Sequence, residues 1–330
     1  MEYSYLGNTS LLVSRIGLGC ELIGGTDWGD VNVREASRAI QLAAELGVNL
    51  FDTADVYGLG LSETRLATAL GNSRKDMVIV TKGGHRWNKQ DPKTRAKIRV
   101  DASRAYLRKS IEGSLKRLRL EKIPIYLHHR PDPTIPLEET ISELSRNVAA
   151  GKIGYFGLSN YSLEEIRRAE QISSIPVIEN CFNIFCNNQD RKILQYADSR
   201  KIGFFAYGVL AQGLLSGNYG KETEFGEKDR RHRLPLFSQA NLCKMEPIFY
   251  QFSLLAIKMG CKTSRLAIEW VLNNKGITSA IVGVRSRQQV YDNLAEPTAS
   301  ISKKEISLIK KGSFEFFMGK PIDYNGSGRT

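Results

Sequence analysis

The stretch NLFDTADVYG, residues 49–58, begins as an apolar strand and ends with two carboxylates and a tyrosine. Burying an ionisable group costs free energy unless the group is paired, so an apolar core needs no such groups at its rim. Their position at the end of a buried strand therefore indicates that the protein carries out its chemistry at this rim.

Similar apolar strands are predicted along the whole chain. With the first they make eight, at residues 16–20, 49–52, 77–82, 123–129, 153–159, 176–180, 202–207 and 279–283. Amphipathic helical segments separate them: SLEE from Ser162 has the spacing of a capping box, and Gly47 and Gly151 stand at predicted helix ends. This alternation, without a linker, predicts an α/β fold, a (β/α)8 TIM barrel that forms a single domain over residues 1–330.

Composition and charge limit the class of protein. The 330 residues are 42% hydrophobic, enough for a large core, yet no apolar run resembles a signal peptide or a membrane span. The five cysteines show no CxxC or Cys/His spacing, so no disulfide framework and no metal site are predicted, and we expect a cytoplasmic protein. The net charge of +12 would suit nucleic acid, but many cations of residues 93–122 fall on the solvated side of an amphipathic helix, which favours no nucleic-acid partner.

Polar side chains stand at the ends of several predicted strands. The second strand ends at Asp52 with Tyr57 shortly after it, the third at Lys82 and the fourth at His129. The ends of parallel barrel strands meet at one mouth, where TIM-barrel enzymes hold their active sites. Singly, each residue has a structural explanation, such as an ion pair or a buried histidine. Together, a tyrosine that donates a proton, a lysine that lowers its pKa, an aspartate that holds the lysine and a histidine that binds a carbonyl oxygen suit the reduction of an aldehyde or ketone.

These motifs resemble those of the aldo-keto reductase superfamily over nearly the whole chain. YLGNTSLLVSRIGLG is similar to its N-terminal β-hairpin and first barrel strand, and FDTADVYG, IVTKGG and LHHRPDP are similar to its aspartate-tyrosine, lysine and histidine motifs. The resemblance implies that Asp52, Tyr57, Lys82 and His129 form the catalytic tetrad, with Tyr57 as the general acid. In this register His129, and not His128, takes the catalytic position, because neighbouring strand residues point to opposite faces.

The resemblance also implies a nicotinamide cofactor that lies extended across the barrel mouth. No GxGxxG follows the first strand, so a Rossmann domain is not predicted. GKIGYFGLSNYS, AYGVLAQGLLSG and AIVGVRSRQQVYDNL resemble the family's cofactor-binding segments. The residues implied are Ser159, Asn160 and Glu179 at the carboxamide, Tyr207 on the nicotinamide ring, Leu210, Gln212 and Gly213 along the pyrophosphate, and Gly283, Arg285, Gln289, Asp292 and Asn293 toward the adenosine.

Two features of these segments bear on the cofactor. Arg285 follows the eighth strand, and its permanent charge and fixed donors suit the 2′-phosphate, which favours NADPH/NADP+ over NADH. Glu179 stands where many relatives have glutamine, so it keeps an acceptor for the carboxamide and loses an amide donor. A further departure, Pro124 where aspartate is common, lies at a strand start, where proline is tolerated.

The substrate and the oligomeric state stay open at this point. Aldehydes, ketosteroid-like ketones, keto sugars and quinone or xenobiotic carbonyls all suit the predicted chemistry. Trp28 and Trp87 lie in loops that follow strands, where they either line the substrate pocket or cap the barrel or an oligomer contact. The basic segment GEKDRRHRLPLF, residues 226–237, either closes over the cofactor or forms an exposed loop.

A second class of function has the same motifs. The pattern also resembles the potassium channel β subunits, which bind the cofactor tightly and act mainly as partners of another protein. We favour the enzyme, because the chain has no segment that looks dedicated to partner docking. A metal-dependent barrel hydrolase is disfavoured, since there are only four histidines and none has HxH spacing.

Overall fold

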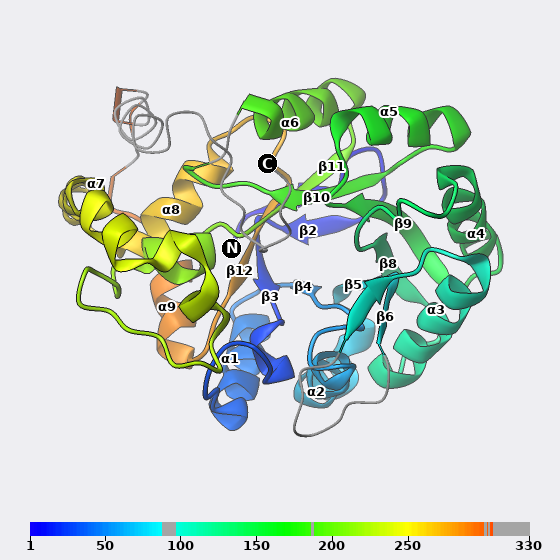
Figure 1. Cartoon of the computed structure of the whole chain (residues 1–330), viewed down its shortest axis with the longest axis horizontal. Helices are drawn as coiled ribbons and strands as arrows, with labels where there is room; N and C mark the ends of the chain where they lie inside the picture. Colours follow the sequence, from blue (N-terminus) through cyan, green and yellow to red (C-terminus); the bar gives the residue numbers. More distant parts are fainter. Residues whose placement is uncertain (88–96, 186–187, 300–301, 303, 306–330) are drawn as a thin grey trace.

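The computed structural model describes residues 1–87, 97–185 and 188–299, together with Ser302, Lys304 and Glu305. Eight parallel strands close into a barrel, with neighbours in the order β10-β11-β12-β3-β4-β5-β8-β9 (Figure 1). The strands are β3 (Ile16–Gly19), β4 (Leu50–Asp52), β5 (Val78–Gly83), β8 (Ile123–His128), β9 (Ile153–Ser159), β10 (Val177–Cys181), β11 (Gly203–Tyr207) and β12 (Ser279–Gly283). Each coincides with a predicted strand to within one residue at either end, so the predicted (β/α)8 barrel is confirmed.

Helices form a ring around the strands in Figure 1. They are α1 (Val33–Glu45), α2 (Leu61–Leu70), α3 (Arg104–Leu118), α4 (Leu137–Ala149), α5 (Leu163–Ile172), α6 (Asn188–Arg200), α7 (Gln239–Lys258), α8 (Thr263–Leu272) and α9 (Arg287–Leu294). The predicted capping box opens α5: the Ser162 hydroxyl accepts the Glu165 N–H, and the Glu165 carboxylate accepts the Ser162 N–H. Gly47 and Gly151 follow α1 and α4 with φ angles of 91° and 72°, a backbone conformation that favours glycine.

An N-terminal hairpin of β1 (Tyr3–Tyr5) and β2 (Leu12–Ser14) precedes the barrel, as the resemblance implied. Its Leu6 and Val13 are fully buried among apolar side chains from the inside of the barrel. Leu6 packs against Gly203, the first residue of β11, so closely that a Cβ there would lie 2.2 Å from it. The hairpin therefore covers the N-terminal ends of the strands and leaves the C-terminal ends as the mouth.

A second hairpin and several short 3₁₀ helices lie in the connections between the barrel elements. The hairpin, β6 (His85–Trp87) with β7 (Ile98–Val100), follows β5 and was not predicted. The 3₁₀ helices are η1 (Leu22–Gly24), η2 (Gly71–Lys75), η3 (Ala211–Ser216), η4 (Arg230–Arg233) and η5 (Pro235–Phe237). Pro124 is the second residue of β8, and pairing with β9 continues on both sides of it. Across the described ranges, no helix combines the length and the apolar character that a membrane span requires.

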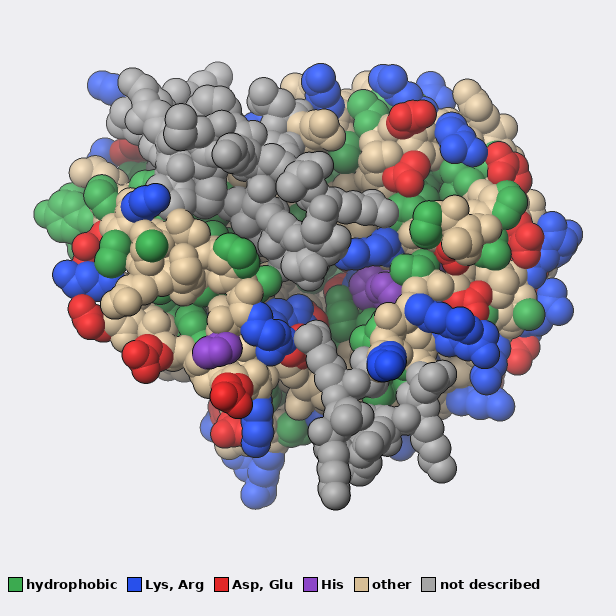
Figure 2. All heavy atoms as spheres, viewed as in Figure 1, with side chains coloured by type: hydrophobic (Ala, Val, Ile, Leu, Met, Phe, Trp, Pro, Cys, Tyr) green, Lys and Arg blue, Asp and Glu red, His purple; other side chains and the backbone are tan. Residues whose placement is uncertain are grey.

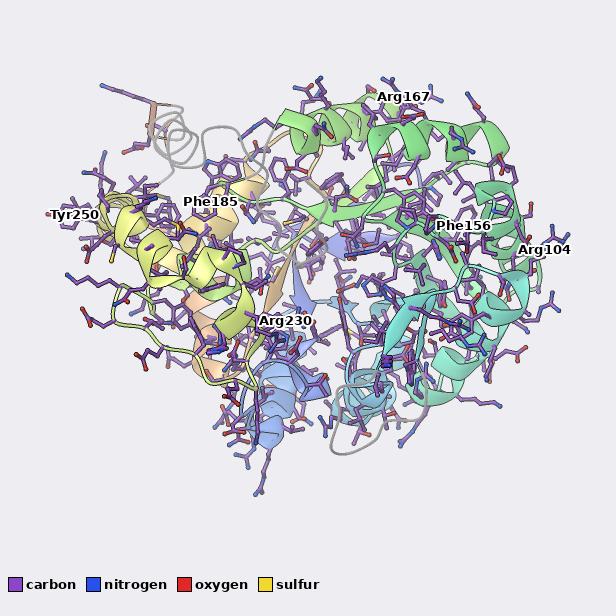
Figure 3. All side chains as sticks on the ribbon, viewed as in Figure 1. Arg104, Phe156, Arg167, Phe185, Arg230 and Tyr250 are labelled. Carbon is purple, nitrogen blue, oxygen red and sulfur yellow. The ribbon has the colours of Figure 1, made fainter. Side chains whose placement is uncertain are left out.

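Charged side chains are spread over the outer face that Figure 2 shows, where Lys and Arg are interspersed with Asp and Glu. In Figure 3, Arg104 and Arg167 project outward from α3 and α5. Arg230, in contrast, lies over the middle of the barrel. Arg230 is therefore placed at the mouth, apart from the cations on the surrounding helices.

Candidate active site

Three buried ionisable groups from three strands meet inside the mouth. Lys82 of β5 donates a hydrogen bond to Asp52 Oδ1 of β4 at 2.5 Å, and its Nζ lies 3.3 Å from Glu179 Oε1 of β10. Lys82 also donates to the carbonyl oxygen of Thr53 at 3.1 Å. All three charged side chains are at most 6% exposed, so one ammonium group is shared by two carboxyl groups out of contact with bulk water.

Burial decides how this cluster titrates. Desolvation raises the pKa of Asp52, against the attraction of Lys82. Desolvation together with repulsion from Asp52 raises the pKa of Glu179 to about 8. Burial by itself lowers the pKa of Lys82, but attraction to Asp52 and Glu179 outweighs it and leaves that pKa well above its ordinary value. Lys82 therefore stays charged, and Glu179, with a pKa raised to about 8, holds a proton at neutral pH.

Tyr57 lies beside this cluster, in the turn after β4. Its ring centroid is 5.4 Å from Lys82 Nζ and 5.8 Å from the ring of His129, which it meets edge-on. Burial raises the pKa of Tyr57 well above its ordinary value, and the attraction of Lys82 opposes this without reversing it. The expectation that Lys82 brings the pKa of Tyr57 down is therefore wrong as a net effect, because desolvation of the phenol is the larger contribution. A phenol in this environment holds its proton.

The two neighbouring histidines point in opposite directions, as predicted. His129 directly follows β8, and its backbone N–H donates a hydrogen bond to the Gly83 carbonyl oxygen at 2.9 Å. The centre of its ring lies 4.4 Å from the centre of the His85 ring. His128 is buried on the other face, with its Nδ1 2.6 Å from the hydroxyl of Tyr161. Burial lowers the pKa of His129 well below its ordinary value, so its ring is neutral at physiological pH. A neutral imidazole beside Tyr57 suits a hydrogen bond to a carbonyl oxygen.

Two neighbouring cavities, which share several lining residues, lie at the mouth. The first, which we call the long cleft, has a volume of about 290 Å³ and reaches Asp52 and Tyr57 at one end. It is lined by nine of the predicted cofactor-binding residues: Tyr207, Leu210, Gln212, Gly213, Gly283, Arg285, Gln289, Asp292 and Asn293. The second, the inner cavity, has a volume of about 390 Å³ and is lined by His129 and by the other three, Ser159, Asn160 and Glu179. Tyr57 and Tyr207 line both, so the predicted residues extend from one cavity to the other.

The side of the inner cavity near β9 is held by a network around Asn160. Its amide nitrogen donates to the carbonyl oxygen of His129 at 2.9 Å and to Ser159 Oγ at 3.0 Å, and its side-chain oxygen accepts the Tyr207 hydroxyl at 2.5 Å. Asn160 has a φ of 63°, a strained conformation for a residue other than glycine. The network therefore fixes Ser159, Asn160 and Tyr207 relative to His129.

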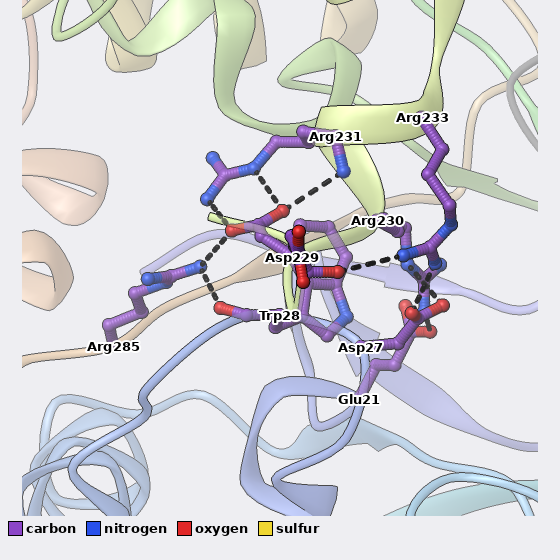
Figure 4. Close-up of polar contacts among 9 residues, drawn as sticks. Glu21, Asp27, Trp28, Asp229, Arg230, Arg231, Arg233 and Arg285 are labelled. Carbon is purple, nitrogen blue, oxygen red and sulfur yellow. Dashed lines mark hydrogen bonds and ion pairs between the residues drawn. The ribbon is translucent and has the colours of Figure 1, made fainter. Parts of the chain in front are cut away.

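The basic segment 226–237, which we call the strap, crosses the long cleft. Asp229 forms a β-bridge with Trp28, and Arg230 lies with its guanidinium 4.6 Å from the centre of the Trp28 ring (Figure 4). Arg231 makes hydrogen bonds of 2.9 and 2.6 Å to the Asp229 carboxylate. Asp229 and Arg231 are only 5% and 4% exposed, so the alternative of an exposed loop is wrong for these two residues.

Arg285 and the two candidate tryptophans also have definite places. Arg285 donates to the Trp28 carbonyl at 3.0 Å and lies 3.9 Å from the Asp229 carboxylate, so it joins the strap to the Trp28 loop (Figure 4). Trp28 lines the long cleft and not the inner cavity. Trp87 lies on β6 and is not among the described residues that line either cavity.

Five ionisable residues of the inner cavity were not predicted from the sequence: Glu21, Asp27, His85, Arg130 and Arg230. Glu21 and Asp27 both pair with Arg230, the second at 3.6 Å. Arg130 forms no ion pair with any residue that the structure describes. Glu21 and Arg130 could have been predicted by the reasoning that identified the tetrad, because each directly follows a predicted barrel strand, residues 16–20 and 123–129. Asp27 and Arg230 come from separate long loops that only the folded chain brings together.

A parallel barrel that gathers a tyrosine, a lysine, an aspartate and a histidine beside a long cleft defines the class of carbonyl-reducing barrel oxidoreductases. The family model of the aldo/keto reductase family matches residues 15–313, and the chain belongs to that family. The resemblance seen in the sequence is thereby confirmed, and the protein is an oxidoreductase.

Relatives and solved structures agree with this assignment. The aldo-keto reductase YhdN of Bacillus subtilis (strain 168) is 32% identical over 316 residues, which cover 94% of this chain and 93% of the relative. The structure of the glycerol dehydrogenase AKR11B4 from Gluconobacter oxydans is similar with a TM-score of 0.86 and 32% identity, over 97% of both chains. The holo form of the aldo-keto reductase AKR11C1 from Bacillus halodurans is similar with a TM-score of 0.74 and 25% identity, over 94% of this chain and 96% of that one.

Proposed function

We propose that this chain reduces a small, hydroxylated aldehyde or ketone with NADPH, and that Tyr57 is the proton donor. The observation that carries the proposal is the inner cavity, which brings Tyr57 and His129 together with a polar rim at the end of the long cleft. Glu21, Asp27, Arg130 and other polar groups give this cavity a lining that suits hydroxyl groups, whereas a steroid or a quinone would place apolar surface against charged side chains. The structural similarity to a glycerol dehydrogenase supports the same substrate class.

The residues present suit a nicotinamide group at the junction of the two cavities. Two buried polar atoms there, His129 Nδ1 and Glu179 Oε2, have no hydrogen-bond partner among the described residues. Buried polar atoms are almost always paired, so these two are available to bound molecules. In the proposal, Ser159, Asn160 and Glu179 bind the carboxamide, Tyr207 packs on the ring, and the long cleft holds the rest of the cofactor.

In the proposed mechanism, the cofactor supplies a hydride to the carbonyl carbon when it is bound. His129 donates a hydrogen bond to the carbonyl oxygen and orients it toward Tyr57. Tyr57 transfers its proton to that oxygen as negative charge develops there. Lys82 stabilises the tyrosinate that results, and Asp52 holds Lys82 in place. The raised pKa of Tyr57 keeps the phenol protonated until the transfer takes place.

A panel of carbonyl compounds tests this proposal through the loss of NADPH absorbance. We expect glyceraldehyde, dihydroxyacetone or a keto sugar to be reduced with a higher kcat/KM than benzaldehyde, a quinone or a ketosteroid. A preference for the apolar compounds would contradict the proposed substrate class. Cofactor that copurifies with the protein, with no turnover on any compound, would favour the channel β-subunit type of function instead.

Substitution of Arg285 tests the choice of cofactor. We expect Arg285→Ala to weaken NADPH binding by about 10- to 150-fold, which corresponds to the roughly 1.5–3 kcal/mol of a hydrogen bond to a charged group. NADH affinity should barely change, because NADH has no 2′-phosphate. Both affinities are measured by titrating the protein's fluorescence.

A lysine variant separates the charge of Arg285 from its contact with Trp28. Arg285→Lys keeps a positive charge, so we expect it to retain part of the preference for NADPH. Equal losses for both cofactors in Arg285→Ala would mean that the arginine only holds the strap against Trp28 and does not bind the phosphate.

A further inference from the structure

Glu179 differs from Asp52 and Lys82, the other groups of the cluster, because it lines the inner cavity. Its Oε1 lies 3.3 Å from Lys82 Nζ and accepts the Ser159 hydroxyl at 3.3 Å. Its Oε2 has no hydrogen-bond partner among the described residues, although the residue is only 2% exposed. Glu179 therefore places a carboxyl group that is held against Lys82 and Asp52 in the wall of the inner cavity.

The protonation of Glu179 sets the net charge of the cluster. With Glu179 neutral, Asp52 and Lys82 balance each other; with Glu179 ionised, the cluster carries one uncompensated negative charge. Burial and repulsion from Asp52 raise the pKa of Glu179 to about 8, so this change falls between neutral and alkaline pH.

Four neighbouring titratable groups keep their charge over the same range. Tyr57 and Lys82 have pKa values raised well above their ordinary values, the first by burial and the second by its carboxyl partners against the effect of burial. Burial lowers the pKa of His85 to about 4 and that of His129 well below its ordinary value. The remaining ionisable or charged groups that line the cavity are Glu21, Asp27, Arg130, Tyr207 and Arg230.

We propose that Glu179 selects between the reduced and the oxidised cofactor according to its own protonation. The inference rests on the proposed function, which places the nicotinamide beside Glu179. A neutral Glu179 shares its proton with Asp52, to which its side chain is hydrogen-bonded, and keeps an acceptor oxygen for the carboxamide. A carboxylate lacks the donor, and its charge attracts the oxidised nicotinamide ring, which is cationic, but not the reduced ring, which is neutral. The carboxamide is present in both forms of the cofactor, so neutral Glu179 does not distinguish between them, and its ionisation at alkaline pH shifts the preference toward NADP+.

The test is the ratio of the dissociation constants of NADP+ and NADPH at about pH 6.5 and about pH 9.5, from calorimetric or fluorescence titration. We expect the ratio for the wild-type protein to fall by about tenfold between these pH values, the effect of roughly 1.4 kcal/mol of charge interaction. We expect the ratio for Glu179→Gln to stay constant and to match the wild type at the lower pH. Both cofactor forms carry the 2′-phosphate, so its own titration cancels in the ratio.

Asp55→Asn is the matched control. Asp55 is another fully buried carboxyl whose pKa burial raises well above its ordinary value, but it is bonded to Ser110 and lines neither cavity. We expect this variant to keep the wild-type pH dependence. Thermal unfolding shows whether each variant is folded, and Glu179→Asp, which retains the acid, should keep a pH-dependent ratio if Glu179→Gln does not fold.

Three outcomes would overturn the inference. They are a ratio independent of pH in the wild type, an unchanged pH dependence in Glu179→Gln, and loss of the dependence in Asp55→Asn. In each case both cofactor forms still bind, and the proposed function stands. Failure of both forms to bind the wild-type protein at either pH would overturn the proposed function together with the inference.

Discussion

Tyr57→Phe is expected to lower kcat for carbonyl reduction by about 10²- to 10⁴-fold, the range that a positioned general acid contributes. NADPH affinity should change by less than about threefold, because the variant removes only the hydroxyl, worth roughly one neutral hydrogen bond at most. The phenyl ring keeps its edge contact with His129 and its place at the junction of the cavities. Single-turnover reduction, followed by NADPH absorbance, measures the chemical step separately from cofactor binding.

Tyr161→Phe controls for the loss of a buried hydroxyl as such. The Tyr161 hydroxyl is hydrogen-bonded to His128, the last residue of β8, and Tyr161 lines neither cavity. We expect this variant to lose about 1 kcal/mol of stability and to keep kcat within about threefold. If Tyr57→Phe retained more than a tenth of the wild-type rate, Tyr57 would not be the acid.

The barrel is predictable from this sequence because each strand is a short apolar run bounded by polar or glycine residues, and a run of that kind marks its own ends. The hairpin of β6 and β7 carries no such signal. Its two strands have three residues each, too few for an alternating pattern to be recognised in the sequence. Strands this short depend on the pairing between them, which a single stretch of sequence does not show.

The active site also has features that single stretches of sequence predict and others that depend on contacts between distant segments. Strand ends bring Asp52, Lys82 and His129 to one mouth, and the parallel barrel makes this predictable. The contact of Lys82 with Glu179 is not predictable in this way, because β5 and β10 are not neighbours and face each other across the barrel. The pKa of Tyr57 is missed for a related reason. The sequence shows that a lysine lies near the phenol, but only the folded structure shows that the phenol is fully buried.

Removal of Lys82 tests the whole cluster, because it leaves two buried carboxyl groups without a cation. We expect Lys82→Met to be destabilised by about 3–5 kcal/mol at pH 8, the cost of breaking a buried ion pair from one side. Its activity should also be nearly abolished, because no charge then stabilises the tyrosinate. Denaturant unfolding at pH 8 and pH 5 measures the difference in stability between this variant and the wild type.

The sign of the pH dependence follows from the raised pKa values of Asp52 and Glu179. A carboxyl whose pKa is higher in the folded than in the unfolded state stabilises the fold most at low pH, and this stabilisation is lost as pH rises toward the folded-state pKa. Without Lys82 both pKa values rise further, because its attraction no longer opposes burial. The deficit of Lys82→Met should therefore be smaller at pH 5 than at pH 8.

An exposed ion pair provides the control for this experiment. Lys275 Nζ lies 2.9 Å from Asp198, and the lysine side chain is 88% exposed. Lys275→Met should cost at most about 1 kcal/mol, with little dependence on pH, because water screens the pair. A deficit for Lys82→Met that is equal at both pH values, or larger at pH 5, would mean that Asp52 and Glu179 are not the groups that Lys82 stabilises.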